Sequence, residues 1–232
     1  MKLSDFIIPA TLAVVLAACG TLLVTTTAVA AECTFPAPGK IDVRIDRLDG
    51  QVVLNNERSR DSLSRMQSQS GRANALGSAW TPVGLTLTEL TYKMRLKLEA
   101  LPLSNGRYCA RLTNLDAELG YDKLKVYIAR KFRPGSCAYS SINEHEMTHV
   151  AVFRQALDDY FPRLQRSLDR AARELQPVLA SSPDQAGIYL RKRLNATVQS
   201  LFLEMNRVLD RNNALLDTPE RYRLEQARCK DW

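Results

Sequence analysis

The chain has 232 residues, of which 45% are hydrophobic and 25% are charged, and its formal net charge is +7 at pH 7. These values are typical of a soluble globular protein with one sizeable core. Outside the N-terminus no stretch is apolar enough to cross a bilayer, and no nucleic-acid motif accompanies the positive charge. We therefore expect no nucleic-acid partner. The basic residues are interpreted as solvated faces of helices and strands, with attraction to anionic envelope polymers as the alternative.

The N-terminus is typical of a secretory signal peptide. Residues 6–29 are nearly uncharged and apolar and lead into a small-residue cleavage signal. Cleavage near Ala31 would make residues 1–31 the signal peptide and residues 32–232 the mature domain of a periplasmic or secreted protein. The alternative is a lipoprotein anchored to a membrane through Cys19, although the residues that follow Cys19 stay apolar where a polar tether is usual. An uncleaved membrane anchor is the third interpretation.

The first part of the mature domain has the alternating pattern of β-strands. Apolar and charged residues alternate over residues 41–46, and residues 51–54 predict a second short strand after a turn. Residues 57–66 favour a short surface helix and residues 71–82 a loop. The longest alternation follows at residues 90–99, which have one apolar face and one mainly basic face.

A β-hairpin is expected next. Ser104-Asn105-Gly106 predicts a turn, after which residues 107–115 return as the partner of the strand at residues 90–99. Another alternating strand covers residues 124–132. These elements predict a mainly antiparallel sheet.

The rest of the chain has helical periodicity. Ser141 and Glu144 form a capping-box pattern, which predicts a helix that begins just before His145. Pro162 either ends or kinks this helix, and residues 181–184 form a clear break before a last long helix. A sheet followed by a long helical hairpin is an α+β fold.

The start of this helical part contains His145-Glu146-Met147-Thr148-His149, which includes both histidines of the chain. Residues at i and i+4 lie on one helix face, so both imidazoles can reach one metal ion. Glu146 lies about 100° further round the helix, where its carboxylate can act as general base on a metal-bound water. This is the H-E-x-x-H pattern of zinc peptidases, and it predicts Zn2+ as the cofactor. A chance occurrence on a solvated helix is the alternative. The preceding strand, residues 124–132, offers an edge on which a peptide substrate can pair.

Ser136-Cys137-Ala138-Tyr139, leading into the histidine motif, resembles the zincin metallopeptidases. It is most similar to a bacterial group of predicted secreted zinc-dependent proteases. That group also has alternating strands with a cysteine ahead of the motif, as at Cys109 here, and two long helices after it. The resemblance covers roughly residues 80–222 and implies hydrolysis of a protein or peptide substrate. Members often finish with Asp-x-x-Thr-x-His-Gly, whereas the comparable stretch here, residues 216–220, lacks the histidine and the glycine.

The third zinc ligand has to be a carboxylate or be absent, because a catalytic zinc usually has three protein ligands and the chain has no third histidine. If Thr218 matches the threonine of the group, Glu220 takes the place of its histidine. A helical hairpin that reverses near residue 182 would bring residue 219 level with His145. Asp217 and Glu220 lie on either side of residue 219. We rank Glu220 first and Asp217 second.

Two other carboxylates stay open as ligands. Glu174 becomes the neighbour of His145 if the chain also reverses at Pro162, and Glu204 resembles the helical glutamate ligand of gluzincins. A solvated or salt-bridged surface carboxylate is the alternative for each. Tyr139 and Tyr222 are candidates for an oxyanion donor, with a packed tyrosine as the simpler interpretation.

Four cysteines remain after signal-peptide cleavage, and an even number in an exported chain predicts two disulfides. The helical hairpin would bring Cys229 back toward Cys137. We therefore predict the pairs Cys137–Cys229 and Cys33–Cys109. A four-cysteine zinc site is the competing interpretation, but no C-x-x-C spacing supports it.

We accordingly predict an exported zinc metallopeptidase of α+β fold, mainly β over residues 32–135 and mainly α over residues 136–232. His145, His149 and Glu220 are expected to bind zinc, and Glu146 is expected to be the general base. The alternative is a non-catalytic envelope protein that has a structural or vestigial metal site and uses its helices as an interaction surface.

Overall fold

One long central strand, β3 (Tyr108–Ile128), organises the sheet in the computed structural model, which describes residues 33–37, 39–70 and 80–232. On one side β3 pairs antiparallel with β2 (Gly84–Pro102), its partner in the predicted hairpin. On the other side it pairs parallel with β1 (Asp42–Asn55). The short β4 (Val178–Ala180) also pairs antiparallel with the start of β3. The expected signal peptide and residues 71–79 of the expected loop lie outside the described residues.

The α+β class is confirmed, and two of the three strand pairings in the sheet are antiparallel as predicted, while the pairing of β1 with β3 is parallel. The chain leaves β1, forms α1 (Arg60–Gln69), and then builds the β2–β3 hairpin beside β1. The connection from β1 to β3 contains α1 and β2 and is therefore long enough for these two strands to pair in parallel. The alternating patterns in the sequence predict the individual strands but do not indicate that β1 pairs with β3.

Strands that the sequence separates are continuous in the structure. The predicted strands at residues 41–46 and 51–54 are both part of β1, which continues through Gly50 at a φ of 69°. Likewise β3 runs through Gly120, at a φ of 141°, and includes residues 124–128. Those residues pair with both β1 and β2, so the prediction that this segment offers a free edge to a substrate is wrong.

The metal-motif helix α2 (Cys137–Glu174) begins earlier than predicted. Its N-cap is Ser136, whose side chain accepts a hydrogen bond from the Tyr139 N–H at 3.2 Å. Ser141 lies inside the helix and is buried, so the capping-box prediction is wrong. The true cap lacks a glutamate three residues later, which is why the more complete pattern at Ser141 was misleading. Pro162 lies within α2 and does not end it.

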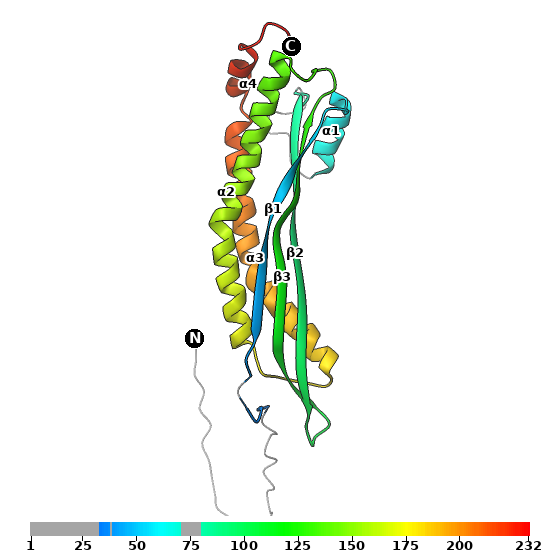
Figure 1. The fold of residues 1–232 in the computed structure, drawn as a ribbon, viewed down its shortest axis with the longest axis vertical. Helices are drawn as coiled ribbons and strands as arrows, with labels where there is room; N and C mark the ends of the chain where they lie inside the picture. The colour runs from blue at the N-terminus through cyan, green and yellow to red at the C-terminus, as the bar shows by residue number, and fades with distance from the viewer. Residues whose placement is uncertain (1–32, 38, 71–79) are drawn as a thin grey trace, which may run out of the picture. The chain divides into compact units, whose positions relative to one another are not determined.

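The helices α2 and α3 (Pro183–Leu216) form the predicted hairpin and cover one face of the sheet, side by side (Figure 1). Their apolar stripes meet the strands in one core, as the 3.6-residue period requires. Its largest buried members include Tyr121, Phe153, Leu164, Leu168 and Leu190. The short α4 (Pro219–Gln226) follows α3 and returns beside the first turns of α2. In the described part of the chain, no helix has both the length and the apolarity that crossing a membrane requires.

Both predicted disulfides are present. Cys33 is bonded to Cys109 at the start of β3, and Cys137 at the start of α2 is bonded to Cys229 after α4. Disulfides of this kind fit an oxidising compartment, such as the one that an exported protein reaches.

The close approach of β1 to Gly120 generates a test of the fold. A Cβ at residue 120 would overlap the backbone carbonyl of Leu48, and the positive φ is strained for any other residue. Gly120→Ala should therefore lower the free energy of unfolding by about 3 kcal/mol in urea titrations followed by circular dichroism.

Gly106→Ala is the matched control, because Gly106 also has a positive φ, of 76°, but nothing lies within 4 Å of an added Cβ. Strain alone should cost about 1 kcal/mol there. Equal losses in the two variants would mean that contact with β1 is not what requires glycine at residue 120.

Candidate metal centre

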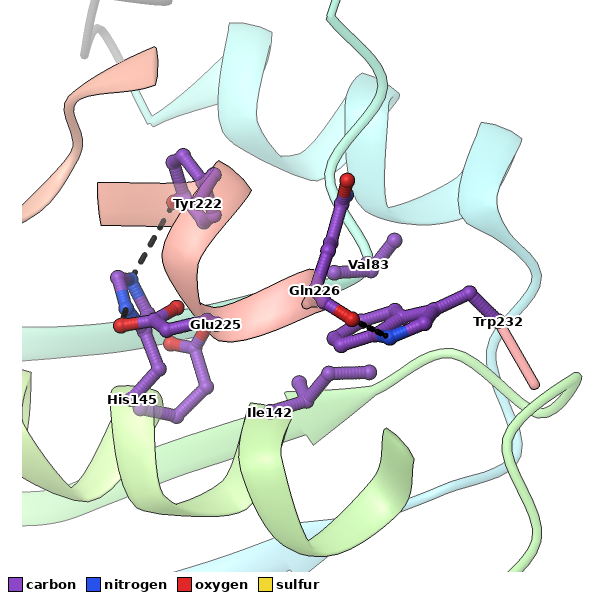
Figure 2. Close-up of a pocket in the computed structure, with 8 residues that line it drawn as sticks. Val83, Ile142, His145, Tyr222, Glu225, Gln226 and Trp232 are labelled. Carbon is purple, nitrogen blue, oxygen red and sulfur yellow. Dashed lines mark hydrogen bonds and ion pairs between the residues drawn. The ribbon is translucent and has the colours of Figure 1, made fainter. Parts of the chain in front are cut away.

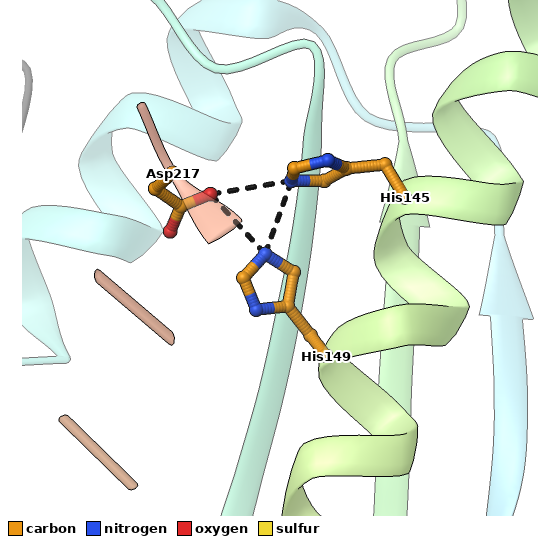
Figure 3. Close-up of side chains that lie close together, drawn as sticks. All are labelled: His145, His149 and Asp217. Carbon is orange, nitrogen blue, oxygen red and sulfur yellow. Dashed lines mark hydrogen bonds and ion pairs between the residues drawn. The ribbon is translucent and has the colours of Figure 1, made fainter. Parts of the chain in front are cut away.

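Three ligand atoms from two helices converge on one point. His145 and His149 lie one turn apart on α2 and are buried, with exposed fractions of 5% and 7%. Asp217 is the C-cap of α3, and its Oδ1 lies 3.2 Å from the Nε2 atoms of both histidines. The two Nε2 atoms are 3.1 Å apart (Figure 3). This group is able to hold a metal ion.

The spacing of the three atoms matches tetrahedral coordination. Ligands at the usual zinc distances of about 2.0–2.1 Å are separated by about 3.3 Å in a tetrahedron. The observed separations of 3.1, 3.2 and 3.2 Å are close to that value on all three sides. One ion can therefore contact all three atoms without any rearrangement of the helices.

Hydrogen bonds to the other ring nitrogens fix the orientation of both imidazoles. His145 Nδ1 lies 3.1 Å from Glu225 Oε1, and His149 Nδ1 lies 2.7 Å from Asn213 Oδ1. Because both partners are acceptors, both Nδ1 atoms carry the hydrogen. Each neutral ring then directs the lone pair of Nε2 toward the other ring and toward a carboxylate oxygen. Three lone pairs at this spacing repel each other unless a cation lies among them.

In the metal-free protein, protons take the place of that cation. Burial disfavours the imidazolium form, but hydrogen bonds to Asp217 and Glu225 and the charge of Glu146 outweigh it, raising the pKa of His145 to about 9. The pKa of His149 is also raised, with burial again opposed by Asp217 and Glu146. For Asp217 burial is outweighed by hydrogen bonds to the two histidines, so its pKa is well below the ordinary range.

The helix α4 completes the surroundings of the metal group. The Tyr222 hydroxyl donates a hydrogen bond to Asp217 Oδ1 at 2.6 Å and lies 3.3 Å from His145 Nε2. Its ring packs on the His145 imidazole with centroids 4.9 Å apart. Burial, followed by the charge of Asp217, raises the pKa of Tyr222, which keeps the hydroxyl protonated as a donor.

Glu146 is held beside this group by β2. Glu146 is only 4% exposed. Its carboxylate accepts a hydrogen bond from Thr86 Oγ1 at 2.7 Å. Gly84 makes room for it, because a Cβ at that position would overlap the Glu146 carboxylate. Burial raises the pKa of Glu146, although the two histidines oppose this shift.

A narrow pocket opens beside His145 and Glu146 (Figure 2). Its polar side is formed by Tyr222 and Glu225 of α4. Its apolar side is formed by Val83, Ile142 and Trp232, and Gln226 completes the lining. Glu146 therefore lies beside a pocket that has one apolar wall and one polar wall.

The structure brings the second-ranked carboxylate, Asp217, to the histidines, and not the first-ranked Glu220. The hairpin brings Asp217 level with His145, two residues before the expected position at residue 219. Glu220 lies in the first turn of α4 and is exposed. Glu174 is exposed at the end of α2, and Glu204 forms an ion pair with Arg163 instead.

Four neighbours of the site were not anticipated from the sequence. Two of them, Asn213 and Glu225, orient the histidines, and the other two, Gly84 and Thr86, position Glu146. A weak signal existed for Asn213, since it lies one turn before Asp217 as His145 lies one turn before His149. The positioning groups on β2 and α4 depend on tertiary contacts and leave no local pattern. Tyr139 packs against a second apolar cluster, which includes Ile142 and Phe132.

Comparison of the chain with models of protein families, with curated proteins and with solved structures gave no match. What the site does must therefore be inferred from its own geometry and chemistry.

Exchanging the two competing carboxylates for amides tests the ligand set. Asp217→Asn should lower zinc affinity at least tenfold, because the substitution removes a negative charge and because an amide oxygen is a weaker zinc ligand than a carboxylate oxygen. Glu220→Gln, three residues away and exposed, should leave the affinity unchanged. Competition with a chromophoric chelator measures both. Loss of affinity in the Glu220 variant alone would overturn the ligand assignment.

The stability of the metal-free protein should depend on pH in a defined direction. The pKa of His145 is about 9 when folded and about 6.5 when unfolded, so its stabilisation is complete below pH 6.5 and is lost as pH rises through 9. We expect a loss on the order of 2 kcal/mol between pH 6.5 and 9 in EDTA. A metal ion that binds the ring nitrogens has to displace these protons, so any stabilisation by added zinc should grow over the same range. A pH profile in EDTA as steep in His145→Gln as in the parent would contradict this assignment.

Proposed function

We propose that the protein is an exported zinc-dependent metallopeptidase. The observation that carries this proposal is the convergence of three lone pairs, from His145, His149 and Asp217, at the spacing of a tetrahedral ion. Two imidazoles and one carboxylate are a ligand set that suits zinc and leaves a fourth position open. The similarity of the histidine motif to zincin metallopeptidases supports the same conclusion.

Zinc bound by three protein groups lowers the pKa of a bound water and polarises a carbonyl group. The residues of the chain supply the remaining chemistry. Glu146 accepts the proton of the attacking water and later delivers it to the leaving amine. Its raised pKa brings it closer to the pH at which a carboxyl group can both take up and release a proton.

Thr86 and Gly84 keep Glu146 in place for this role. The Thr86 hydroxyl holds one carboxylate oxygen, and the backbone of Gly84 lies against the other. A carboxylate that is restrained in this way loses little entropy when it engages the water. Tyr222 donates its hydrogen bond to the ligand oxygen of Asp217, which directs that carboxylate toward the ion.

The strand that can present a substrate to Glu146 is β2 rather than β3. β2 pairs with β3 along one edge, and in the described part of the chain no strand pairs with its other edge. Thr86 places this strand directly beside Glu146. A peptide in extended conformation can add to such an edge through backbone hydrogen bonds.

Substitution of the general base separates metal binding from hydrolysis. Glu146→Gln should retain stoichiometric zinc, because Glu146 is not a ligand, and should lower the hydrolysis of an unstructured protein substrate by about 10²–10⁴-fold. Glu144→Gln is the matched control, since Glu144 lies on the same helix and its side chain is 73% exposed. Its activity should be unchanged.

Other results would decide against the enzyme. Absence of stoichiometric zinc from the wild-type protein would overturn the proposal. Stoichiometric zinc without hydrolysis of any protein or peptide would instead favour the alternative of a non-catalytic envelope protein with a structural metal site.

A further inference from the structure

The helix α4 contributes to the metal centre, and its main apolar anchor is the ring of Tyr222, whose centroid lies 5.9 Å from the Trp80 ring and 4.9 Å from the His145 ring. Its sequence, Pro219–Gln226, is nearly all polar, and its one buried residue is Glu225, which is 9% exposed. Its leucine, Leu224, is 66% exposed. Apart from the ring of Tyr222, hydrophobic burial therefore contributes little to holding this helix against the protein.

Two side chains of α4 nevertheless contact the metal ligands. Glu225 accepts the hydrogen bond from His145 Nδ1, and Tyr222 donates one to Asp217. Arg221, one turn before Glu225, lies 3.3 Å from its Oε1 and holds the carboxylate from the solvent side. The orientation of His145 thus depends on α4 staying in place.

The Cys137–Cys229 disulfide attaches the far end of α4 covalently. Cys229 follows the helix by three residues, and Cys137 is the first residue of α2, about 12 Å before His145 along the helix axis. The other contacts of the residues after α4 are non-covalent. Arg228 and Glu144 form an exposed ion pair, the rings of Trp232 and Phe132 make a T-shaped contact, and Trp232 Nε1 donates a 2.7 Å hydrogen bond to the Gln226 carbonyl. The disulfide is therefore the main constraint on the end of α4.

We infer that the Cys137–Cys229 disulfide controls the metal centre: it holds α4, and with it Glu225 and Tyr222, against the ligands His145 and Asp217. When the bond is intact, His145 is oriented for the ion. When the bond is reduced, the end of α4 is released and the metal is bound more weakly. This inference concerns the regulation of the proposed zinc site and rests on that proposal.

The redox step is an ordinary thiol–disulfide exchange. A dithiol reductant attacks the bond through a thiolate, and its second thiol resolves the mixed disulfide. Two electrons and two protons pass to Cys137 and Cys229, and the reductant becomes a disulfide. Cys137 is exposed, so the bond can be reached from solvent. Loss of partners of this kind usually lowers metal affinity 10–100-fold, and we expect the same range here.

The second disulfide provides a matched control. Cys109 of β3 pairs with Leu101 near one end of β2. Glu146 is held by Thr86 near the other end of β2. These two residues of β2 are about 50 Å apart along the strand. Removing Cys33–Cys109 also deletes one covalent link from the chain, but it leaves the surroundings of His145 intact.

The experiment compares two double variants of the full chain, C137S/C229S and C33S/C109S, with the wild type. Serine cannot bind zinc as a thiolate would, so the readout is not confused by new ligands. Amide hydrogen exchange of the metal-free proteins should show at least tenfold faster exchange in residues 219–229 of C137S/C229S only. Competition with a chromophoric chelator should show 10–100-fold weaker zinc binding in the same variant, with the control within threefold of wild type.

Three results would overturn the inference. Unchanged exchange in residues 219–229 would mean that the disulfide does not hold α4. Unchanged zinc affinity despite faster exchange would mean that α4 does not orient His145. Equal weakening in both double variants would point to general destabilisation. A wild-type chain that binds no zinc would overturn the proposed function as well, which distinguishes that failure from the others.

Discussion

The register between α2 and α3 determines most of what this protein can do. Packing of their apolar stripes on one face of the sheet places His145 level with Asp217 and His149 level with Asn213. A shift of one helical turn would separate the carboxylate from the imidazoles by about 5 Å. The energy that maintains this register comes from the buried core, where residues such as Phe153 and Leu190 exclude water over a large area.

Local patterns in the sequence were sufficient for much of the fold. The α+β class, the β2–β3 hairpin and the two long helices follow from periodicities of two and 3.6 residues. The pairing of Cys137 with Cys229 followed from the helical hairpin, because an antiparallel return brings the two ends together. The same reasoning came within two residues of the level position at Asp217. It could not separate Asp217 from Glu220, because it assumed one continuous helix, whereas α3 ends at Leu216 and Glu220 lies on α4.

Contacts between distant segments account for what the sequence did not indicate. Gly120 interrupts the alternation that marks a strand, yet its backbone lets β3 continue beside Leu48 of β1. Glu225 lies in a polar helix without an apolar stripe, so no periodicity marks its role. Thr86 and Gly84 are unremarkable in a strand and acquire a role only because α2 places Glu146 against them.

The separation of the metal group along the chain has a consequence for folding. Asp217 follows His149 by 68 residues, so a chain that has formed only α2 offers an ion the two imidazoles without the third ligand of the group. An ion that needs all three ligands would bind tightly only after α3 has docked on α2. Such an ion would stabilise the finished hairpin relative to partly folded forms.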